Sequence, residues 1–481
     1  MHSQPPFHSY DSIPHHHHQQ QQDLDLLQSD QPGYGTRNIV EVSFNMVNAT
    51  VGAGVIGLPL ALLLAGFING ILLSIMVALL TFAAVYGMIL AGQRVGVYKF
   101  AALGEHVMGR FGFHTLNLML FIQSAGSVVS YFILVADTLP ILLKLYLPDE
   151  YRYLSNRTLV TVMIAIFVIF PLNIPRSIGA LASWSTLSVL LLPVMILSVL
   201  IRAPAYSTMH DAPLTMWGTD PVSAIGIMSF ALVCSQVAFN NYLSQRNQSS
   251  TAWGCTTGLS TFISWTVSIT FAIIGYLCFG KDVESNIFAN FPENDNVINI
   301  GRLSLGLSMV LTVPMAFYPA RDAVQKSLGF ETAEKQPTTF QHYGVTIVLF
   351  VVFLFFGITV RSLGKVYSVV GGFASAYLAY MMPAMAYIGA FHPNWLPWNN
   401  HSYFLGFFGC SKSADLVQQQ EGEEEEHQQD SIAQQQSLLI KDDETAIIVL
   451  PKRKLWLDLS SIILLGFGSI VMVFTAMKAF D

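Results

Sequence analysis

The sequence predicts an all-α integral membrane protein with eleven transmembrane helices. Its 481 residues are 53% hydrophobic and only 11% charged, whereas about a quarter of the residues of an ordinary soluble domain are charged. The apolar residues form long runs, which favours helices over the alternating strands of a membrane barrel. The net charge of −7 lies mostly in polar tails and loops, so the composition predicts a lipid bilayer as partner and no nucleic acid.

The predicted spans are the apolar runs that approach the length needed to cross a bilayer, about 20 residues. They are 38–66, 69–91, 115–136, 158–171, 180–201, 221–242, 256–279, 299–319, 342–360, 366–391 and 456–478. The polar segments 1–36 and 396–455 are predicted to be a disordered N-terminal tail and a disordered loop. A majority of the 23 Lys and Arg residues lies on the side of these two segments, which predicts that this side, with the N-terminus, is cytosolic. The last part, 456–481, holds the eleventh helix and the C-terminus.

The predicted core, 37–391, divides into two halves of similar length, 37–201 and 221–391, with five spans each. An odd number of spans gives the two halves opposite orientations, so they can form a 5+5 inverted repeat with one extra helix. In such an architecture the first helix of each half is broken near the midplane, and the ligand binds between the breaks. This prediction depends on span number and length, because the halves show no similarity residue by residue.

The first span contains Asn48-Ala-Thr-Val-Gly-Ala-Gly-Val-Ile-Gly-Leu-Pro59, and its glycines and proline weaken a helix. Lipid cannot bind the backbone groups that such a break frees. The N–H groups around Gly52, Ala53 and Gly54 can instead bind a carboxylate, and the carbonyls near Asn48 to Val51 can bind an ammonium group or a cation. The Asn48 amide and the Thr50 hydroxyl add polar ligands. A zwitterionic amino acid suits this pair of sites, although close packing of small residues also explains the glycines.

Two other spans carry candidate residues. The span 221–242 has Ser229, Cys234 and Ser235 in its middle, and we expect them to form a pocket wall that selects side chains. Thr312 is a lone hydroxyl in the span 299–319; it either bonds to the carbonyl four residues earlier or binds Na⁺. No series of Asp, Glu or His runs through the spans, which favours Na⁺ coupling or uncoupled flux over a proton relay. We expect no bound cofactor and no enzyme, because no catalytic motif is present.

Three motifs in this order resemble the amino acid/auxin permease family, in particular its sodium-coupled neutral amino acid transporters and its vacuolar amino acid transporters. They are Asn48 to Pro59, Pro171-Leu-Asn-Ile-Pro-Arg176 with Ile178-Gly-Ala-Leu181, and Leu311-Thr-Val-Pro314 with Pro319-Ala-Arg321. The resemblance implies a LeuT-like fold of eleven helices and L-amino acids as substrates.

By motif, Asn48 and Thr312 match a sodium site, and Thr50, Val51, Gly52, Ala53 and Gly54 match the substrate-binding backbone. Many members of the family have Cys-His where this chain has Cys234-Ser235, so a role for that histidine does not carry over.

The expected function is therefore secondary active transport of L-amino acids, most of them neutral, by alternating access with Na⁺ or H⁺ as the coupling ion. The alternative is an amino acid sensor at an organelle membrane with little flux, which signals through 1–36 or 396–455. Sorting or regulatory partners are expected on the same two segments. Asp23-Leu-Asp-Leu-Leu27 resembles a dileucine sorting signal, which favours a vacuolar or lysosomal membrane over the plasma membrane.

Overall fold

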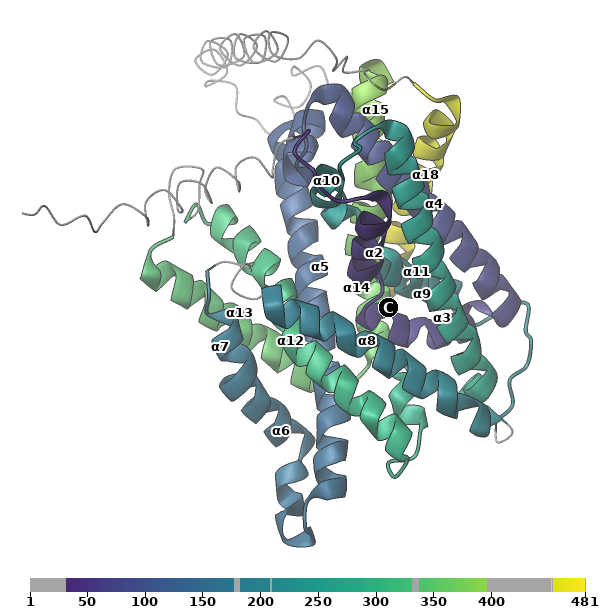
Figure 1. Ribbon diagram of the computed structural model, residues 1–481, viewed down its shortest axis with the longest axis vertical. Coiled ribbons are helices and arrows are strands. Elements are labelled where there is room, and N and C mark those ends of the chain that lie inside the picture. Colours follow the sequence, from purple (N-terminus) through teal and green to yellow (C-terminus); the bar gives the residue numbers. More distant parts are fainter. Residues whose placement is uncertain are drawn as a thin grey trace, which may run out of the picture.

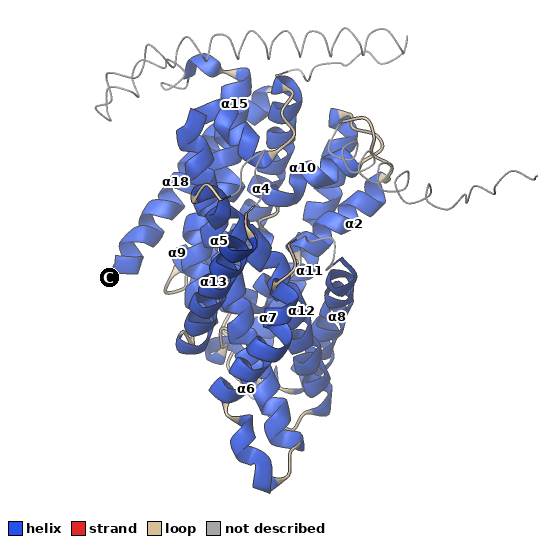
Figure 2. Ribbon diagram, turned by 90° about the vertical axis from the view of Figure 1, so that its left-hand side faces the viewer, coloured by secondary structure: helices blue, strands red, loops and turns tan. Residues whose placement is uncertain are grey.

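The computed structural model describes residues 32–176, 182–207, 210–330, 337–395, 451 and 453–480. Over these residues the regular structure is helical, with long helices joined by short turns (Figures 1 and 2). Nine helices of the described chain are long and apolar enough to cross a membrane, and the bent pair Ile39–Thr50 with Ala53–Ala65 adds a tenth. The predicted all-α membrane architecture is confirmed.

Each predicted span has a helical counterpart. They are α2 (Ile39–Thr50) with α3 (Leu58–Ala65), α4 (Phe67–Val95), α5 (Phe100–Tyr146), α6 (Arg157–Ile164) with α7 (Phe170–Asn173), α8 (Ala182–Arg202), α9 (Pro221–Leu232) with α10 (Ser235–Ser244), α11 (Ser250–Phe279), α12 (Asn296–Ser327), α13 (Thr339–Thr359), α14 (Leu363–Val370) with α15 (Met382–Phe391), and α18 (Leu455–Phe480). The segment of α6 and α7, Arg157–Asn173, is shorter than the others. The number of eleven spans therefore stays a prediction.

Polar side chains fix where several helices begin. Asn38 caps α2 in a reciprocal capping box with Glu41, which satisfies two of the N–H groups that a helix start leaves free. The Asp220 carboxylate accepts from the Ser223 N–H at the start of α9, and Pro221 occupies the first helical position, where no N–H is needed. These caps fix the first residues of the two helices that lead into the breaks.

The two broken helices lie at the centre of the molecule. Helix α3 packs against α9 and α11, and α2 packs against α11 and α10 (Figure 1). Helix α12 packs chiefly against α5 and α8, on the other side of the fold. The first helices of the two predicted halves are thus neighbours, as an inverted repeat requires.

The tenth span supports α9 through an unusually close contact. Helix α14 continues into α15 through two π-helical segments, Gly371–Ser375 and Tyr377–Met381. A Cβ added at Gly371 would lie 1.9 Å from the carbonyl oxygen of Gly226 on α9, so only glycine permits this approach. Wide π-helical turns are frequent at functional sites, and here they lie directly behind the second broken helix.

The described chain starts before α2. The Gly33 N–H donates to the Gln248 side-chain oxygen at 3.0 Å. The Arg37 N–H donates to the Ser244 carbonyl at 3.0 Å, and the Arg246 N–H donates to the Arg37 carbonyl at 2.8 Å. These bonds fasten the residues before α2 to the end of α10. The predicted tail up to residue 31 and loop residues 396–450 lie outside the described residues.

Candidate functional site

The first broken helix exposes backbone donors in the middle of its span. Helix α2 ends at Val51, whose N–H donates to the Val47 carbonyl at 2.7 Å, and the backbone turns away from the helix at Gly52 (φ −139°, ψ −149°). The helix resumes after a bend of 53°. Within the described residues, the N–H groups of Gly52, Ala53 and Gly54 have no hydrogen-bond acceptor. A Cβ added at Gly52 would meet no atom within 4 Å, so there is open space beside Gly52, whereas Ala53 and Gly54 are buried.

The second broken helix has the same design with different residues. Helix α9 stops at Leu232, Val233 is extended (φ −67°, ψ 125°), and α10 begins at Ser235 without a side-chain cap. Cys234 lies in the break itself (φ −141°, ψ 7°). The positive end of the α10 dipole therefore points into the same region as the free amides of the first break.

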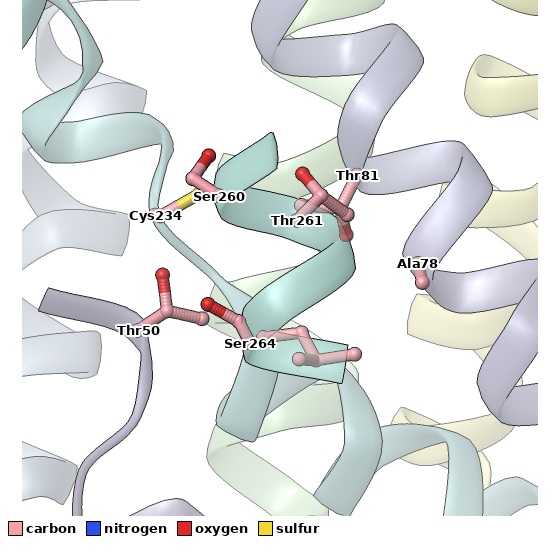
Figure 3. Close-up of a pocket in the computed structure, with 8 residues that line it drawn as sticks. Thr50, Ala78, Thr81, Cys234, Ser260, Thr261 and Ser264 are labelled. Carbon is pink, nitrogen blue, oxygen red and sulfur yellow. The ribbon is translucent and has the colours of Figure 1, made fainter. Parts of the chain in front are cut away.

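The two breaks meet at a small cavity between α2, α4, the end of α9 and α11. A Cβ added at Gly54 would lie 2.8 Å from Cα of Ala231, which shows how closely the broken segments approach. The cavity has a volume of about 10 Å³, and Thr50, Ala78, Thr81, Leu232, Cys234, Ser260, Thr261 and Ser264 line it (Figure 3). A space of this size holds about one water molecule. The site is therefore closed around a group of that size in this conformation.

The cavity wall is uncharged and rich in hydroxyl groups. The Thr50 hydroxyl donates to the Met46 carbonyl at 2.8 Å, and the Thr81 hydroxyl donates to the Val77 carbonyl at 2.9 Å. Ser260 likewise donates to the Thr257 carbonyl at 3.0 Å. Thr50 also has a side-chain hydrogen bond with Cys234, and Thr81 has one with Tyr380. The predicted residues Thr50 and Cys234 lie here, whereas Ser260 and Ser264 were missed by the sequence reasoning, although they recur one turn apart on an apolar helix.

Tyrosines of the tenth span hold both breaks from behind and were also missed. The Tyr367 hydroxyl donates to the Ala53 carbonyl at 2.9 Å, and its ring stacks on Phe230 with 4.6 Å between ring centroids. The hydroxyls of Ser229 and Tyr380 share a buried hydrogen bond of 2.9 Å. Ser229 thus bonds to the supporting helix and does not line the cavity. Ser235 is buried, and its hydroxyl has no partner within the described chain.

Asn48 lies on a different surface from Thr50. It belongs to an exposed face of α2 that lines a cleft of about 420 Å³, together with Arg37, Val40, Glu41, Phe44 and Asn45. This cleft begins where α2 begins and ends at Asn48, one turn before the break. The Asn45 amide donates to the Asn241 side-chain oxygen at 2.7 Å and joins α2 to α10 at the edge of this face. Asn48 is therefore exposed on the outer face of α2, whereas Thr50 lines the buried cavity.

Thr312 makes the local bond that is common for a helical threonine. Its hydroxyl donates to the Ser308 carbonyl at 2.7 Å, and it lines neither the cavity nor the cleft. No hydrogen bond connects it with Asn48 in the described part of the chain, so the predicted sodium pair stays a prediction. Among the described residues no group of three or more His, Cys, Asp or Glu side chains could hold a metal ion.

A family model described as "Transmembrane amino acid transporter protein" matches residues 35–414, which include both breaks and the cavity. The chain belongs to this family. The match confirms the predicted resemblance, and it identifies the broken helices as part of an amino acid transporter core.

Curated relatives carry names of the same kind. A Danio rerio protein provisionally named sodium-coupled neutral amino acid transporter 11 is 27% identical over 375 residues, which cover 77% of this transporter and 83% of the relative. Vacuolar amino acid transporter 2 of Saccharomyces cerevisiae is 28% identical over 357 residues, 70% of this chain and 74% of its own. These names describe transporters and no enzyme. Among solved structures, the crystal structure of MhsT in complex with L-phenylalanine aligns with 93% of this chain and 100% of its own, at 13% identity and a TM-score of 0.47.

Proposed function

We propose that this protein is a secondary active transporter that moves neutral L-amino acids by alternating access, with the substrate carboxylate bound to the N–H groups of Gly52, Ala53 and Gly54. These donors have no acceptor within the described residues. An unpaired backbone group inside a membrane span costs several kcal/mol, so an anionic ligand stabilises this conformation of the break. The dipole of the helix that restarts at Ala53 adds to the attraction.

The wall of the cavity supports a neutral substrate. Its lining consists of hydroxyls, a thiol and apolar side chains, with no carboxylate, ammonium or guanidinium group. A charged substrate side chain would be buried there without a partner, which is strongly unfavourable. The names of the relatives agree with amino acids as the cargo.

The difference between the cleft and the cavity supports alternating access. The cleft of about 420 Å³ reaches Asn48 from the N-terminal end of α2, whereas the cavity beyond it holds only about 10 Å³. The residues that line this cleft come from one exposed face of α2 and from Arg37 before it, and an open surface next to a closed cavity agrees with one of the two conformations that alternating access needs. Movement of one half against the other would open the opposite side.

We favour Na⁺ over H⁺ as the coupling ion. No carboxylate or imidazole lines the cavity, and proton-coupled carriers generally place such groups in their pathway. Asn48, the carbonyls at the end of α2 and the Thr312 hydroxyl are the candidate Na⁺ ligands. Thr312 can serve because its oxygen keeps lone pairs after donating its proton to Ser308.

The test of the substrate site is uptake of labelled neutral amino acids into proteoliposomes by Gly52→Ala. The added methyl group would enter the open space in front of the free amides, where nothing lies within 4 Å, and the negative φ of Gly52 suits alanine. We expect uptake to fall by about tenfold or more, as for loss of a charge-assisted hydrogen bond. The control is Gly344→Ala on α13, where the added Cβ also meets no atom within 4 Å. Unchanged uptake in Gly52→Ala would refute the site.

The coupling ion is tested with imposed Na⁺ and pH gradients. We expect accumulation to follow Na⁺ and to be lost in Thr312→Ala, while Thr359→Ala keeps it; Thr359 makes the same bond to a carbonyl four residues back, on the exposed side of α13. Accumulation that follows only the pH gradient would make Thr312 structural.

A sensor is the competing function, and it predicts amino acid binding without flux in the same vesicles. A vacuolar or lysosomal location is also proposed, on the strength of the Asp23 to Leu27 motif and the vacuolar relative. Removal of Leu26 and Leu27 should then redirect the protein to the plasma membrane, as observed by fluorescence microscopy of a tagged chain.

A further inference from the structure

The side of the cavity formed by α11 carries polar groups that the carboxylate site does not use. Ser260, Thr261 and Ser264 present it with a face of hydroxyls, in which Ser260 and Ser264 lie toward Cys234 and Thr50 and Thr261 lies toward Thr81 (Figure 3). Thr50 lies two residues before the first free amide, at Gly52. A substrate whose carboxylate occupies those amides would extend its side chain past Thr50 to reach this face of α11, since Gly52, Ala53 and Gly54 do not line the cavity themselves.

Ser264 is the buried member of this face whose hydroxyl has no hydrogen-bond partner in the described chain. Its side chain is 2% exposed. Thr50, Thr81 and Ser260 already donate their hydroxyl protons to backbone carbonyls. Their protons are therefore already used, whereas the Ser264 hydroxyl is free to donate as well as to accept. A ligand group that both donates and accepts, such as another hydroxyl, matches this arrangement.

The size of the cavity restricts that ligand group. About 10 Å³ holds one water-sized group, and Ala78 and Leu232 close the remaining wall with apolar surface. A water molecule can fill the space when no substrate is bound. A substrate hydroxyl can displace this water and replace its hydrogen bonds, whereas a methyl group displaces it and leaves Ser264 unpaired.

We propose that the hydroxyl face of α11 is a side-chain subsite that favours amino acids with a small hydroxyl side chain, of the serine class, and that Ser264 is the residue that determines this preference. The inference rests on the proposed function, because it deepens the same substrate site. The discrimination between serine and alanine arises because a site with a buried hydrogen-bonding group disfavours a substrate that leaves this group without a partner.

The experiment compares serine with alanine, which differ only by the hydroxyl group. In proteoliposomes we expect kcat/KM of the wild type to favour serine over alanine by about tenfold, the effect of one hydrogen bond. In Ser264→Ala this ratio should fall to about one, because serine loses a hydrogen bond and alanine no longer leaves a buried hydroxyl unpaired. Removing an unpartnered hydroxyl should leave the thermal unfolding midpoint unchanged.

The matched control is Ser268→Ala. Ser268 lies one turn further along α11, is 3% exposed, and also has an unpartnered hydroxyl within the described chain. It lines a separate apolar cavity with Leu58 and Trp265, so we expect the serine to alanine ratio to stay at its wild-type value.

Three results would overturn the inference. An unchanged ratio in Ser264→Ala would show that the side chain does not reach α11. An equal loss for serine and alanine would assign the cavity to a bound water or to the coupling ion. If the wild type transports other neutral amino acids but neither serine nor alanine, the substrate side chain lies elsewhere and the proposed function stands. Absence of flux for every amino acid would refute the proposed function itself.

Discussion

The two broken helices of this transporter expose backbone groups in the same way but depend on different forces. In the first, Gly52, Gly54, Gly57 and Pro59 weaken the helix along its own sequence. The second breaks at Val233 and Cys234, with no glycine or proline at that point. Its conformation is supported from outside, by the close approach of Gly371 to α9 and by the hydrogen bond between Ser229 and Tyr380.

The difference teaches that the two halves of one site can have different sensitivities to substitution. The first break should tolerate changes in its neighbours, since its own residues disfavour a continuous helix. The second should respond to changes on α14 and in the π-helical segments, which hold it in place. Three substitutions test this comparison.

The largest effect is expected from Gly226→Ala on α9. The added Cβ would lie 2.4 Å from the carbonyl oxygen of Ser368, and neither backbone segment can move without displacing the other. Overpacking of this kind costs about 3 kcal/mol, so the thermal unfolding midpoint of the purified protein should fall. The control is Gly258→Ala, whose Cβ would meet only Phe82 at 3.7 Å. An unchanged midpoint would mean that α14 does not support the second break.

A smaller effect is expected from Tyr367→Phe, which tests whether the first break also needs support. The substitution keeps the stacking on Phe230 and removes the hydrogen bond to the Ala53 carbonyl. The Ala53 carbonyl keeps its bond within the short helix Ala53–Gly57, so the loss of the tyrosine hydrogen bond costs about 0.5–1.5 kcal/mol. We expect weaker binding of the amino acid in a titration of the purified protein. Tyr377→Phe is the control, since the Tyr377 hydroxyl is buried without a partner among the described residues. Equal affinities in the two variants would show that the first break is determined by its own glycines.

The smallest effect is expected at Asp295, which lies before α12 and away from both breaks. Burial alone would raise the pKa of its carboxyl, but hydrogen bonds from Tyr206 and Arg202 outweigh burial and hold the pKa below the ordinary 3.8. The stability that the ionised carboxylate contributes is therefore present above pH 3.8 and is lost as pH falls through the lowered pKa.

We expect Asp295→Asn to lower the unfolding midpoint equally at pH 7 and pH 5, with a difference from wild type that shrinks below pH 4. Transport should not change. A difference that already shrinks between pH 7 and pH 5 would contradict the lowered pKa, and a change in serine uptake would show that this end of α12 is coupled to the breaks.

Much of the site could be predicted from the sequence because its main signal is local. The run from Asn48 to Pro59 contains the residues that break the first helix, and Thr50 and Cys234 do line one cavity. Ser229 was assigned to the pocket wall, yet its hydroxyl bonds to Tyr380. A serine on a buried helix gives no indication in the sequence of which neighbour it faces. For the same reason the sequence does not indicate a role for Ser264 or Tyr367, which come from spans without a predicted break.

The sequence by itself determined the membrane class, the order and approximate limits of the spans, and the position of the first break. These depend on hydrophobic length and on the backbone preferences of glycine and proline, which act within a few residues. Only the tertiary structure decided that Val233 and Cys234 form the second break, that the hydroxyls of α11 face it, and that the cleft stops at Asn48. Those features arise from contacts between helices far apart in the chain, where the free energy of packing, and not local preference, selects the conformation.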